Sequence, residues 1–353
     1  MVKYAACWPL CILLTLSFML TASAKAAAFK PLSDGDMAEM TKVVVTMTGD
    51  CVLGGEEKSR KKETSFDSLI AQKGMAWPFS AFSQQFAQDD ITLVNLEGVL
   101  KDTATGRLAD KTHTFRGVTA YTEILRLGSV EHVNIANNHY IDYGKAGRTS
   151  TLKALKQAGI AISGYKELHA VEIGGKKIGF GGIRETVYRQ ERKTMAEDIQ
   201  ALAEMDCDVI IYSCHFGDEY GKTHNTLQTK MTREAIDLGA DFVVGHHPHV
   251  VQGIEYYNGG VILYSLGNFV FGGNLELKEF DSYAVEAAFL WEGEKYRGVQ
   301  LELIPVLTSG TIPENDFRPV PALGEDKARI YKKIQKDSKL KITDCLFFPG
   351  KAD

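Results

Sequence analysis

Six short apolar runs, rich in β-branched residues, recur along the chain, and each is followed at once by polar residues. The runs are Lys42 to Thr48, Ile91 to Leu96, His132 to Ala136, Val209 to Cys214, Phe242 to Val244 and Val261 to Leu266. Runs of this length and composition predict buried strands. Because the runs are almost continuously apolar, we expect both faces of their sheets to be covered.

Helical patterns lie between most of these strands. We expect helices at 119–127, 147–158, 194–205, 227–238 and 326–336. Gly159 and Gly239 are suited to close two of them. Strands that alternate with helices predict a layered α/β fold. A hairpin is expected at 173–178 and an antiparallel pair at 283–291 and 296–306.

The N-terminus has the layout of a secretory signal peptide. Lys3 supplies a positive charge, 8–20 is almost wholly apolar, and small residues follow at 21–24. The alternative is an uncleaved membrane anchor, for which the apolar run is short. We expect cleavage after Ala24 and an exported protein, periplasmic or extracellular and soluble. One domain is expected at 42–310, with a C-terminal extension at 311–353 packed on it or trailing.

Composition restricts the class of partner. The 353 residues are 44% hydrophobic and 24% charged, which is ample for a sizeable core. The formal charge of −5 gives no electrostatic basis for binding nucleic acid, and no stretch is rich enough in Lys and Arg to suggest such binding.

Four cysteines remain after the predicted cleavage, at Cys51, Cys207, Cys214 and Cys345. An even number in an oxidising compartment raises the question of disulfides. Cys207 and Cys214 bracket a strand and should be too far apart to pair. Cys51 and Cys214 both lie near strand ends, and their pairing stays open.

Side chains able to bind metals or carry protons stand at or just after the ends of five of the six runs. They are Asp50, Glu97, Asn138 with His139, His215, and His247 with His249. Each alone has an ordinary interpretation, such as a helix cap or a turn former. Ligands of α/β sheets bind at the carboxyl ends of strands, however, so the full set predicts one shared site.

Carboxylates, an amide oxygen and imidazoles together suit one or two divalent ions such as Zn²⁺, Mn²⁺ or Fe²⁺. Pro248 favours an extended backbone for His247, so His247 and His249 should point the same way and could face one ion, whereas His246 is not expected to bind metal. Glu97 is the candidate bridge between two ions, which can activate a water at a tetrahedral centre. His139 is the candidate proton donor, oriented by Asp142.

The ordered motifs resemble the CapA family, which comprises capsule-synthesis proteins of the poly-γ-glutamate system related to calcineurin-like metallophosphatases. The resemblance covers Val43 to Val306. The motifs are Gly49-Asp50, Asn95-Leu96-Glu97, Ala136-Asn137-Asn138-His139 with Asp142-Tyr143-Gly144, His215-Phe216-Gly217-Asp218-Glu219-Tyr220, His247-Pro248-His249-Val250 and Ser265-Leu266-Gly267-Asn268-Phe269.

This resemblance implies a sandwich of two β-sheets flanked by helices, with the metal centre at the strand ends. It implies that Glu97 bridges two ions, that Asp50 and His249 hold the first, and that the second is held by Asn138, His215 and His247. His139 would be the general acid. Val52 stands where the wider superfamily has a histidine, and Glu97 where an Asp is usual. The first site is therefore poorer in ligands; Cys51 is near enough to substitute, although we expect it to be structural.

Candidate substrate-binding residues are Arg116, which matches the family, and Asn268. With Lys111 and His113, Arg116 can meet an anionic substrate. The alternative for these three is a solvated basic loop, and both interpretations stay open. A denser basic stretch at Arg184, Arg189, Arg192 and Lys193 is more typical of a solvated face than of a binding groove.

Three functions are compatible with these features. The first is an exported metal-dependent enzyme of poly-γ-glutamate production, export or attachment, acting on an amide or phosphate centre of an anionic polymer. The resemblance implies partners among inner-membrane capsule-synthesis proteins. The second is a phosphoesterase acting on a phosphorylated small molecule. The third is a non-catalytic subunit that binds polymer or assists assembly.

Overall fold

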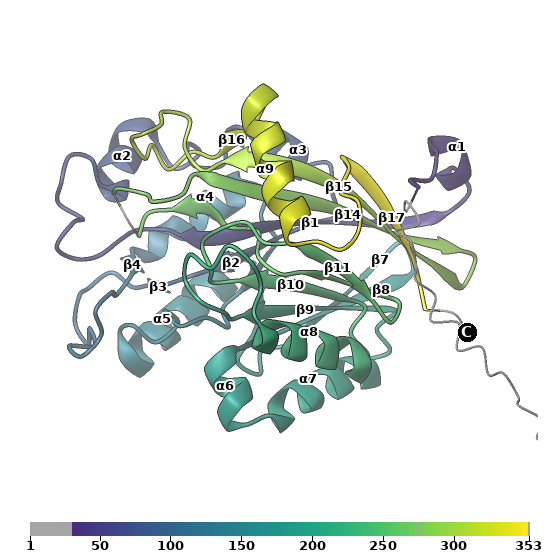
Figure 1. Ribbon diagram of the computed structural model, residues 1–353. Coiled ribbons are helices and arrows are strands. Elements are labelled where there is room, and N and C mark those ends of the chain that lie inside the picture. The colour runs from purple at the N-terminus through teal and green to yellow at the C-terminus, as the bar shows by residue number, and fades with distance from the viewer. Residues whose placement is uncertain (1–29, 274, 352–353) are drawn as a thin grey trace, which may run out of the picture.

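Two β-sheets pack face to face and carry helices on their outer faces (Figure 1). The computed structural model describes residues 30–273 and 275–351, so the predicted signal peptide at 1–24 lies outside the described residues. Within the described part, no helix is long and apolar enough to cross a membrane. The α/β sandwich of two sheets flanked by helices is confirmed.

The larger sheet has nine strands, in the order β16-β15-β14-β1-β2-β5-β6, with β13 paired to β1 and β17 to β15. β1, β2, β5, β6 and β13 run parallel, and β14 and β15 form the predicted antiparallel pair. The strands are β1 Thr41–Val52, β2 Ile91–Leu96, β5 His132–Asn134, β6 Ala161–Ser163, β13 Asn268–Phe271, β14 Asp281–Glu292, β15 Lys295–Leu307, β16 Val320–Pro321 and β17 Cys345–Pro349.

The smaller sheet has six strands, in the order β11-β12-β10-β9-β8-β7. Its four central strands are parallel, and β7 with β8 forms the predicted hairpin. The strands are β7 His169–Ile173, β8 Lys176–Arg184, β9 Val209–His215, β10 Phe242–His246, β11 Ile254–Tyr257 and β12 Gly260–Leu263. A separate two-stranded sheet joins β3 Val99–Leu100 to β4 Arg116–Gly117.

Helices lie over both sheets, and the five predicted ones are present with shifted ends. They are α1 Asp34–Met37, α2 Phe66–Lys73, α3 Ser83–Phe86, α4 Thr122–Leu127, α5 Gly144–Gln157, α6 Glu185–Gln190, α7 Lys193–Glu204, α8 Thr226–Leu238 and α9 Gly324–Lys336. A 3₁₀ turn at Thr119–Tyr121 precedes α4. Gly159 and Gly239 have φ values of 73° and 122° just after their helices, a conformation that favours glycine.

Alternation along the strands explains the layers. In β9, Val209 and Ile211 pack into the core between the sheets, whereas Ile210 and Tyr212 pack under α7 and α8. A third apolar cluster fills the space between the nine-stranded sheet and α2 to α5. α9 closes one side of the inter-sheet core through Ile330.

Cys51 and Cys214, whose pairing the sequence leaves open, do not form a disulfide. All four cysteines of the described residues are free. Cys51 packs into the cluster on the outer face of the nine-stranded sheet. Cys214 packs into the cluster on the outer face of the six-stranded sheet. The two thiols therefore point away from each other, in opposite directions from the inter-sheet core.

Candidate metal centre

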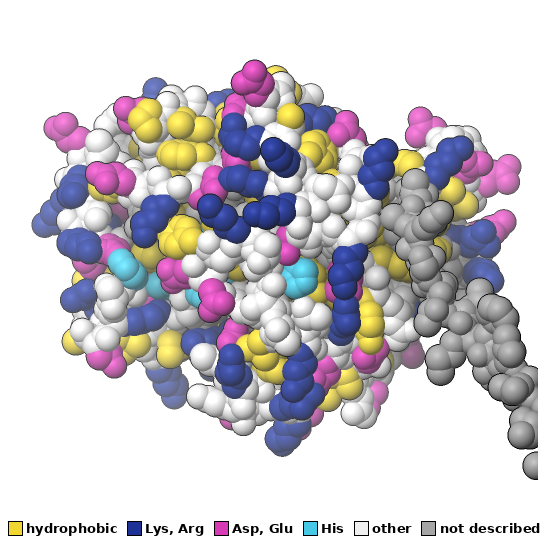
Figure 2. All heavy atoms as spheres, in the orientation of Figure 1, with side chains coloured by type: hydrophobic (Ala, Val, Ile, Leu, Met, Phe, Trp, Pro, Cys, Tyr) yellow, Lys and Arg dark blue, Asp and Glu magenta, His cyan; other side chains and the backbone are white. Residues whose placement is uncertain are grey.

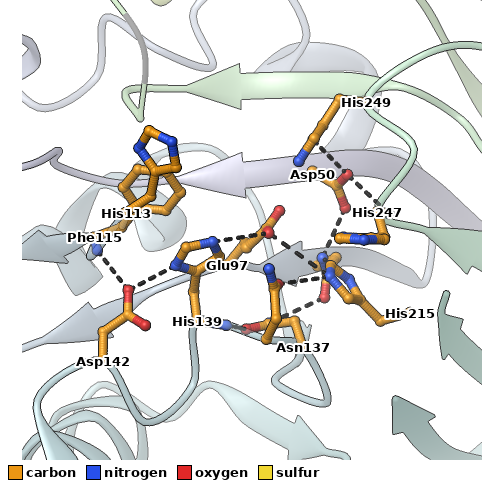
Figure 3. Close-up of polar contacts among 12 residues, drawn as sticks. Asp50, Glu97, His113, Phe115, Asn137, His139, Asp142, His215, His247 and His249 are labelled. Atoms are coloured by element: carbon orange, nitrogen blue, oxygen red, sulfur yellow. Dashed lines mark hydrogen bonds and ion pairs between the residues drawn. The ribbon is translucent and has the colours of Figure 1, made fainter. Parts of the chain in front are cut away.

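The predicted ligands converge where the carboxyl ends of the parallel strands of both sheets meet (Figure 3). Asp50 lies near the end of β1, Glu97 follows β2, and His215 ends β9. The loops after β5 and β10 supply Asn138, His139, His247 and His249. On the face shown in Figure 2 little histidine surface is visible, and Lys and Arg are interspersed with Asp and Glu.

Glu97 is the most unusual side chain of this cluster. It is 0% exposed, and neither carboxylate oxygen has a hydrogen-bond partner among the described residues. His139 Nε2 and His215 Nε2 each lie 3.7 Å from its Oε1. Burial raises the pKa of Glu97 to about 8. A buried carboxylate without partners is costly, and a bound cation would compensate its charge.

Two groups of side chains have potential ligand atoms within 4.8 Å of one another, and Glu97 belongs to both. One group joins Glu97 to His247 and His249, and the other joins it to Asp50 and His215. A carboxylate such as Glu97, which belongs to both groups, is suited to bridge two ions. The remaining residues are divided differently from the division that the resemblance implies, and both divisions stay predictions.

Asp50 is held as a carboxylate. Its oxygens accept hydrogen bonds from Asn95 Nδ2 at 2.7 Å and from the His247 backbone N–H at 3.1 Å, and His249 Nδ1 lies 3.2 Å away. Burial opposes ionisation, but contacts with His246 and His249 hold the pKa of Asp50 well below its usual range. Burial would lower the pKa of His249, yet the charges of Glu97 and Asp50 raise it to about 9.

Other imidazoles are held neutral. Burial lowers the pKa of His215 well below its usual range and that of His247 to about 4. Neutral imidazole is the form that binds metals. His215 Nε2 lies 2.8 Å from Asn138 Oδ1, so these two predicted ligands already face each other. The donor set of carboxylates, imidazoles and an amide oxygen therefore fits a divalent transition metal.

His139 is tightly oriented. Its Nδ1 lies 2.7 Å from Asp142 Oδ2, and its ring stacks on Phe115 with centroids 4.1 Å apart. Asp142 also accepts the Phe115 backbone N–H at 2.6 Å and a contact from Lys111. Burial lowers the pKa of His139, and Asp142 opposes that shift. These contacts leave Nε2 directed towards Glu97, 3.7 Å from its Oε1.

A buried network of asparagines is not predicted from the sequence. Asn95 contacts both Asp50 and His215, at 2.7 and 3.3 Å. Its Oδ1 accepts hydrogen bonds from Asn134 and Asn137. Asn95 stands near the end of the second apolar run, two residues before Glu97, and its place in the Asn95-Leu96-Glu97 motif is a signal that could have indicated its role. The network fixes ligands from both sheets.

The loop after β10 differs from the predicted extended backbone. His247 and His249 have φ values of 100° and 58°, in the left-handed region that non-glycine residues rarely occupy. The expected extended geometry was therefore wrong, because tertiary contacts such as the bond from the His247 N–H to Asp50 override the local preference. Such strain is typical of functional sites. His246 ends β10, with its Nδ1 3.5 Å from Asp50 Oδ1.

The two residues that follow Asp50 in the first motif, Cys51 and Val52, are apolar in character. Val52 is buried, and Cys51 lies in neither of the two groups of potential ligands. Burial raises the pKa of the Cys51 thiol to about 12. Such a thiol is a poor source of the thiolate that binds metals.

The predicted substrate-binding side chains are engaged within the protein. Arg116 is buried and bonds to Glu57 and to the Lys101 carbonyl, so it is not part of a solvated loop. His113 contacts Glu56. Asn268 begins β13, and its Oδ1 lies 2.9 Å from His249 Nδ1, which orients a predicted ligand.

Glycine at position 245 is required by close packing of β10. A Cβ there would lie 2.1 Å from the Tyr264 carbonyl oxygen. Gly245→Ala is expected to destabilise the protein by about 1–3 kcal/mol, because strands β10 and β12 must separate. Urea unfolding measures this change. Gly35→Ala, whose Cβ would meet only Ser33 Oγ at 3.7 Å, is the control, and equal effects of the two would contradict the prediction.

Solved structures resemble the chain only distantly. A hypothetical protein from Thermus thermophilus matches with a TM-score of 0.43 and 14% identity, covering 74% of this chain and 99% of that one. A purple acid phosphatase from yellow lupin matches with a TM-score of 0.36 and 11% identity, covering 81% and 55%. Likenesses this distant carry no conclusion about activity.

Sequence comparison gives closer relatives. A capsule biosynthesis protein CapA of Bacillus anthracis is 27% identical, covering 85% of this chain and 74% of its own length. A PGA biosynthesis protein CapA of Bacillus subtilis is 27% identical, covering 74% and 70%. A probable polyglutamine synthesis accessory protein of Mycobacterium tuberculosis is 30% identical over 51% and 55%. The model of the bacterial capsule synthesis protein family PGA_cap matches residues 44–273, more than half of the chain, and the chain therefore belongs to that family.

Proposed function

We propose that this chain is an exported protein of poly-γ-glutamate capsule synthesis or export, with a divalent metal centre that assists hydrolysis or transfer on the polymer. Family membership supports the capsule context. Two relatives are named for capsule and PGA biosynthesis. The observation that carries the metal centre is the fully buried Glu97 carboxylate, without a hydrogen-bond partner among the described residues and flanked by imidazoles.

In this proposal, one set of residues binds metal and another transfers a proton. One or two ions of Zn, Mn or Fe, held by Asp50, Glu97, Asn138, His215, His247 and His249, would supply a Lewis acid and lower the pKa of a bound water. In its imidazolium form His139 would give the proton on Nε2 to the leaving group, and Asp142 fixes the ring by accepting from Nδ1. Contacts from Lys111 and the Phe115 N–H keep the Asp142 side chain in place.

The cellular context belongs to the same proposal. The predicted signal peptide directs the mature chain to the periplasm or the exterior. We expect the substrate to be an anionic polymer and the partners to be inner-membrane capsule-synthesis proteins. The domain at 42–310 would carry the site, and the described part of the C-terminal extension, 311–351, contains β16, α9 and β17.

A polymer assay tests this function. Protein loaded with Mn²⁺ or Zn²⁺ is incubated with poly-γ-glutamate, and chain length is followed by size-exclusion chromatography. We expect a metal-dependent change in chain length that is lost in Glu97→Gln. Turnover of an aryl phosphate with no change in the polymer would replace this function by a phosphoesterase. Bound metal and polymer with no turnover of either substrate would make the protein a non-catalytic binding subunit.

A further inference from the structure

One arginine of the basic stretch differs from its neighbours. Arg189, Arg192 and Lys193 are exposed and pair with Glu185, Glu234 and Glu197, as expected of a solvated face. Arg184 is part-buried at the end of β8, and no carboxylate of the described residues lies within ion-pair distance of it. Its one side-chain hydrogen bond there is long, at 3.4 Å from Nη1 to the Tyr165 hydroxyl. Arg184 thus has donors to spare.

The position of Arg184 relates it to the candidate metal centre. Arg184 is in register with His215 on the neighbouring parallel strand, so the two side chains leave the same face of the sheet. Tyr165, which Arg184 contacts, donates its hydroxyl to the Asn137 carbonyl at 2.9 Å, next to Asn138. The guanidinium is therefore placed between two segments that supply predicted ligands.

A cavity of about 140 Å³ joins these groups. Its lining includes Arg184 together with Asn138, His215 and His247. Glu185 also lines it, but its two oxygens are occupied by Arg189 and by the Gly217 N–H, each at a distance of 2.8–2.9 Å. Arg184 is consequently an uncompensated charge in a cavity whose lining also includes three predicted metal ligands.

We propose that Arg184, rather than Arg116, binds an oxyanion of the substrate, a carboxylate or phosphate group held beside the predicted ligands Asn138, His215 and His247. Arg116 is committed to Glu57 and the Lys101 carbonyl. A guanidinium matches the planar, two-oxygen geometry of such a group. This inference rests on the proposed function for the identity of the substrate, since each unit of poly-γ-glutamate carries a free carboxylate.

Calorimetric titration tests the inference without relying on turnover. Full-length mature protein, loaded with Mn²⁺, is titrated with a γ-glutamyl tetramer and separately with inorganic phosphate, and its metal content is measured on the same samples. Arg184→Gln is expected to weaken binding about 10- to 100-fold with unchanged metal content. Arg184→Lys should recover part of the loss, and the exposed Arg192→Gln should bind as the wild type does.

The outcomes separate the two proposals. Weaker binding of the tetramer supports a glutamyl carboxylate at Arg184, and weaker binding of phosphate alone keeps the oxyanion role but contradicts the polymer as substrate. Equal binding by Arg184→Gln and the wild type, or no binding of either anion by the wild type, overturns the inference. If the wild type holds no metal, the proposed function fails, and the same titration of metal-free protein still decides whether binding depends on Arg184.

Discussion

Glu97→Gln is expected to abolish the stabilisation of the protein by divalent metal while leaving the metal-free fold intact. Gln has the same shape but lacks the charge, so the buried side chain no longer needs a cation. The metal-free variant should be at least as stable as the metal-free wild type at neutral pH, because it lacks the buried acid whose pKa is raised to about 8 and whose burial therefore costs folding free energy.

Thermal unfolding with and without Mn²⁺ or Zn²⁺ measures this effect. At a metal concentration of about 100 times Kd, binding stabilises the wild type by about 2.7 kcal/mol, or a Tm shift of about 5 °C. The variant should shift by less than about 1 °C. Glu57→Gln, outside both groups of potential ligands, should keep the full shift. A variant that retains the wild-type shift would show that Glu97 does not hold metal.

His139→Asn is expected to lower turnover about 10²- to 10⁴-fold while metal content stays at the wild-type level. Asn removes Nε2, the atom that faces Glu97, and keeps a short polar side chain near Asp142. Proton transfer to the leaving group is then lost, whereas the predicted ligands are untouched. The assay is turnover of the polymer, with elemental analysis of the same sample.

A histidine outside the cluster provides the comparison. His169→Asn, on the edge strand β7, should change turnover less than about twofold, because it lies outside the catalytic cluster. If His139→Asn loses metal together with activity, His139 is a ligand and its assignment as a proton donor is wrong. If turnover is unchanged, another group supplies the proton.

The sequence predicts the fold and the position of the cluster because both follow from local patterns. Apolar runs specify buried strands, and polar residues at the carboxyl ends of parallel strands meet at one edge of their sheet. The strand ends alone therefore bring Asp50 and Glu97 together, whereas His215 joins them only because the second sheet packs against the first. Local pattern also predicts the hairpin at the Gly174-Gly175 turn between β7 and β8.

What the sequence does not predict depends on contacts between distant segments. Asn95 links ligands from two sheets, and its role follows only from how the sheets pack. The left-handed backbone of His247 is set by its bond to Asp50, 197 residues away in the chain. Arg184 resembles its basic neighbours in sequence, and only the register of β8 with β9 separates it from them.

The central claim is that the strand-end cluster binds metal, and elemental analysis of the purified wild-type protein tests it most directly. The protein is exposed to Mn²⁺, Zn²⁺ and Fe²⁺, freed of excess ions by gel filtration, and examined by mass spectrometry beside Glu97→Gln. We predict about one or two transition-metal ions per wild-type chain and less than about 0.1 in the variant. A wild-type chain with no more metal than Glu97→Gln would contradict the account.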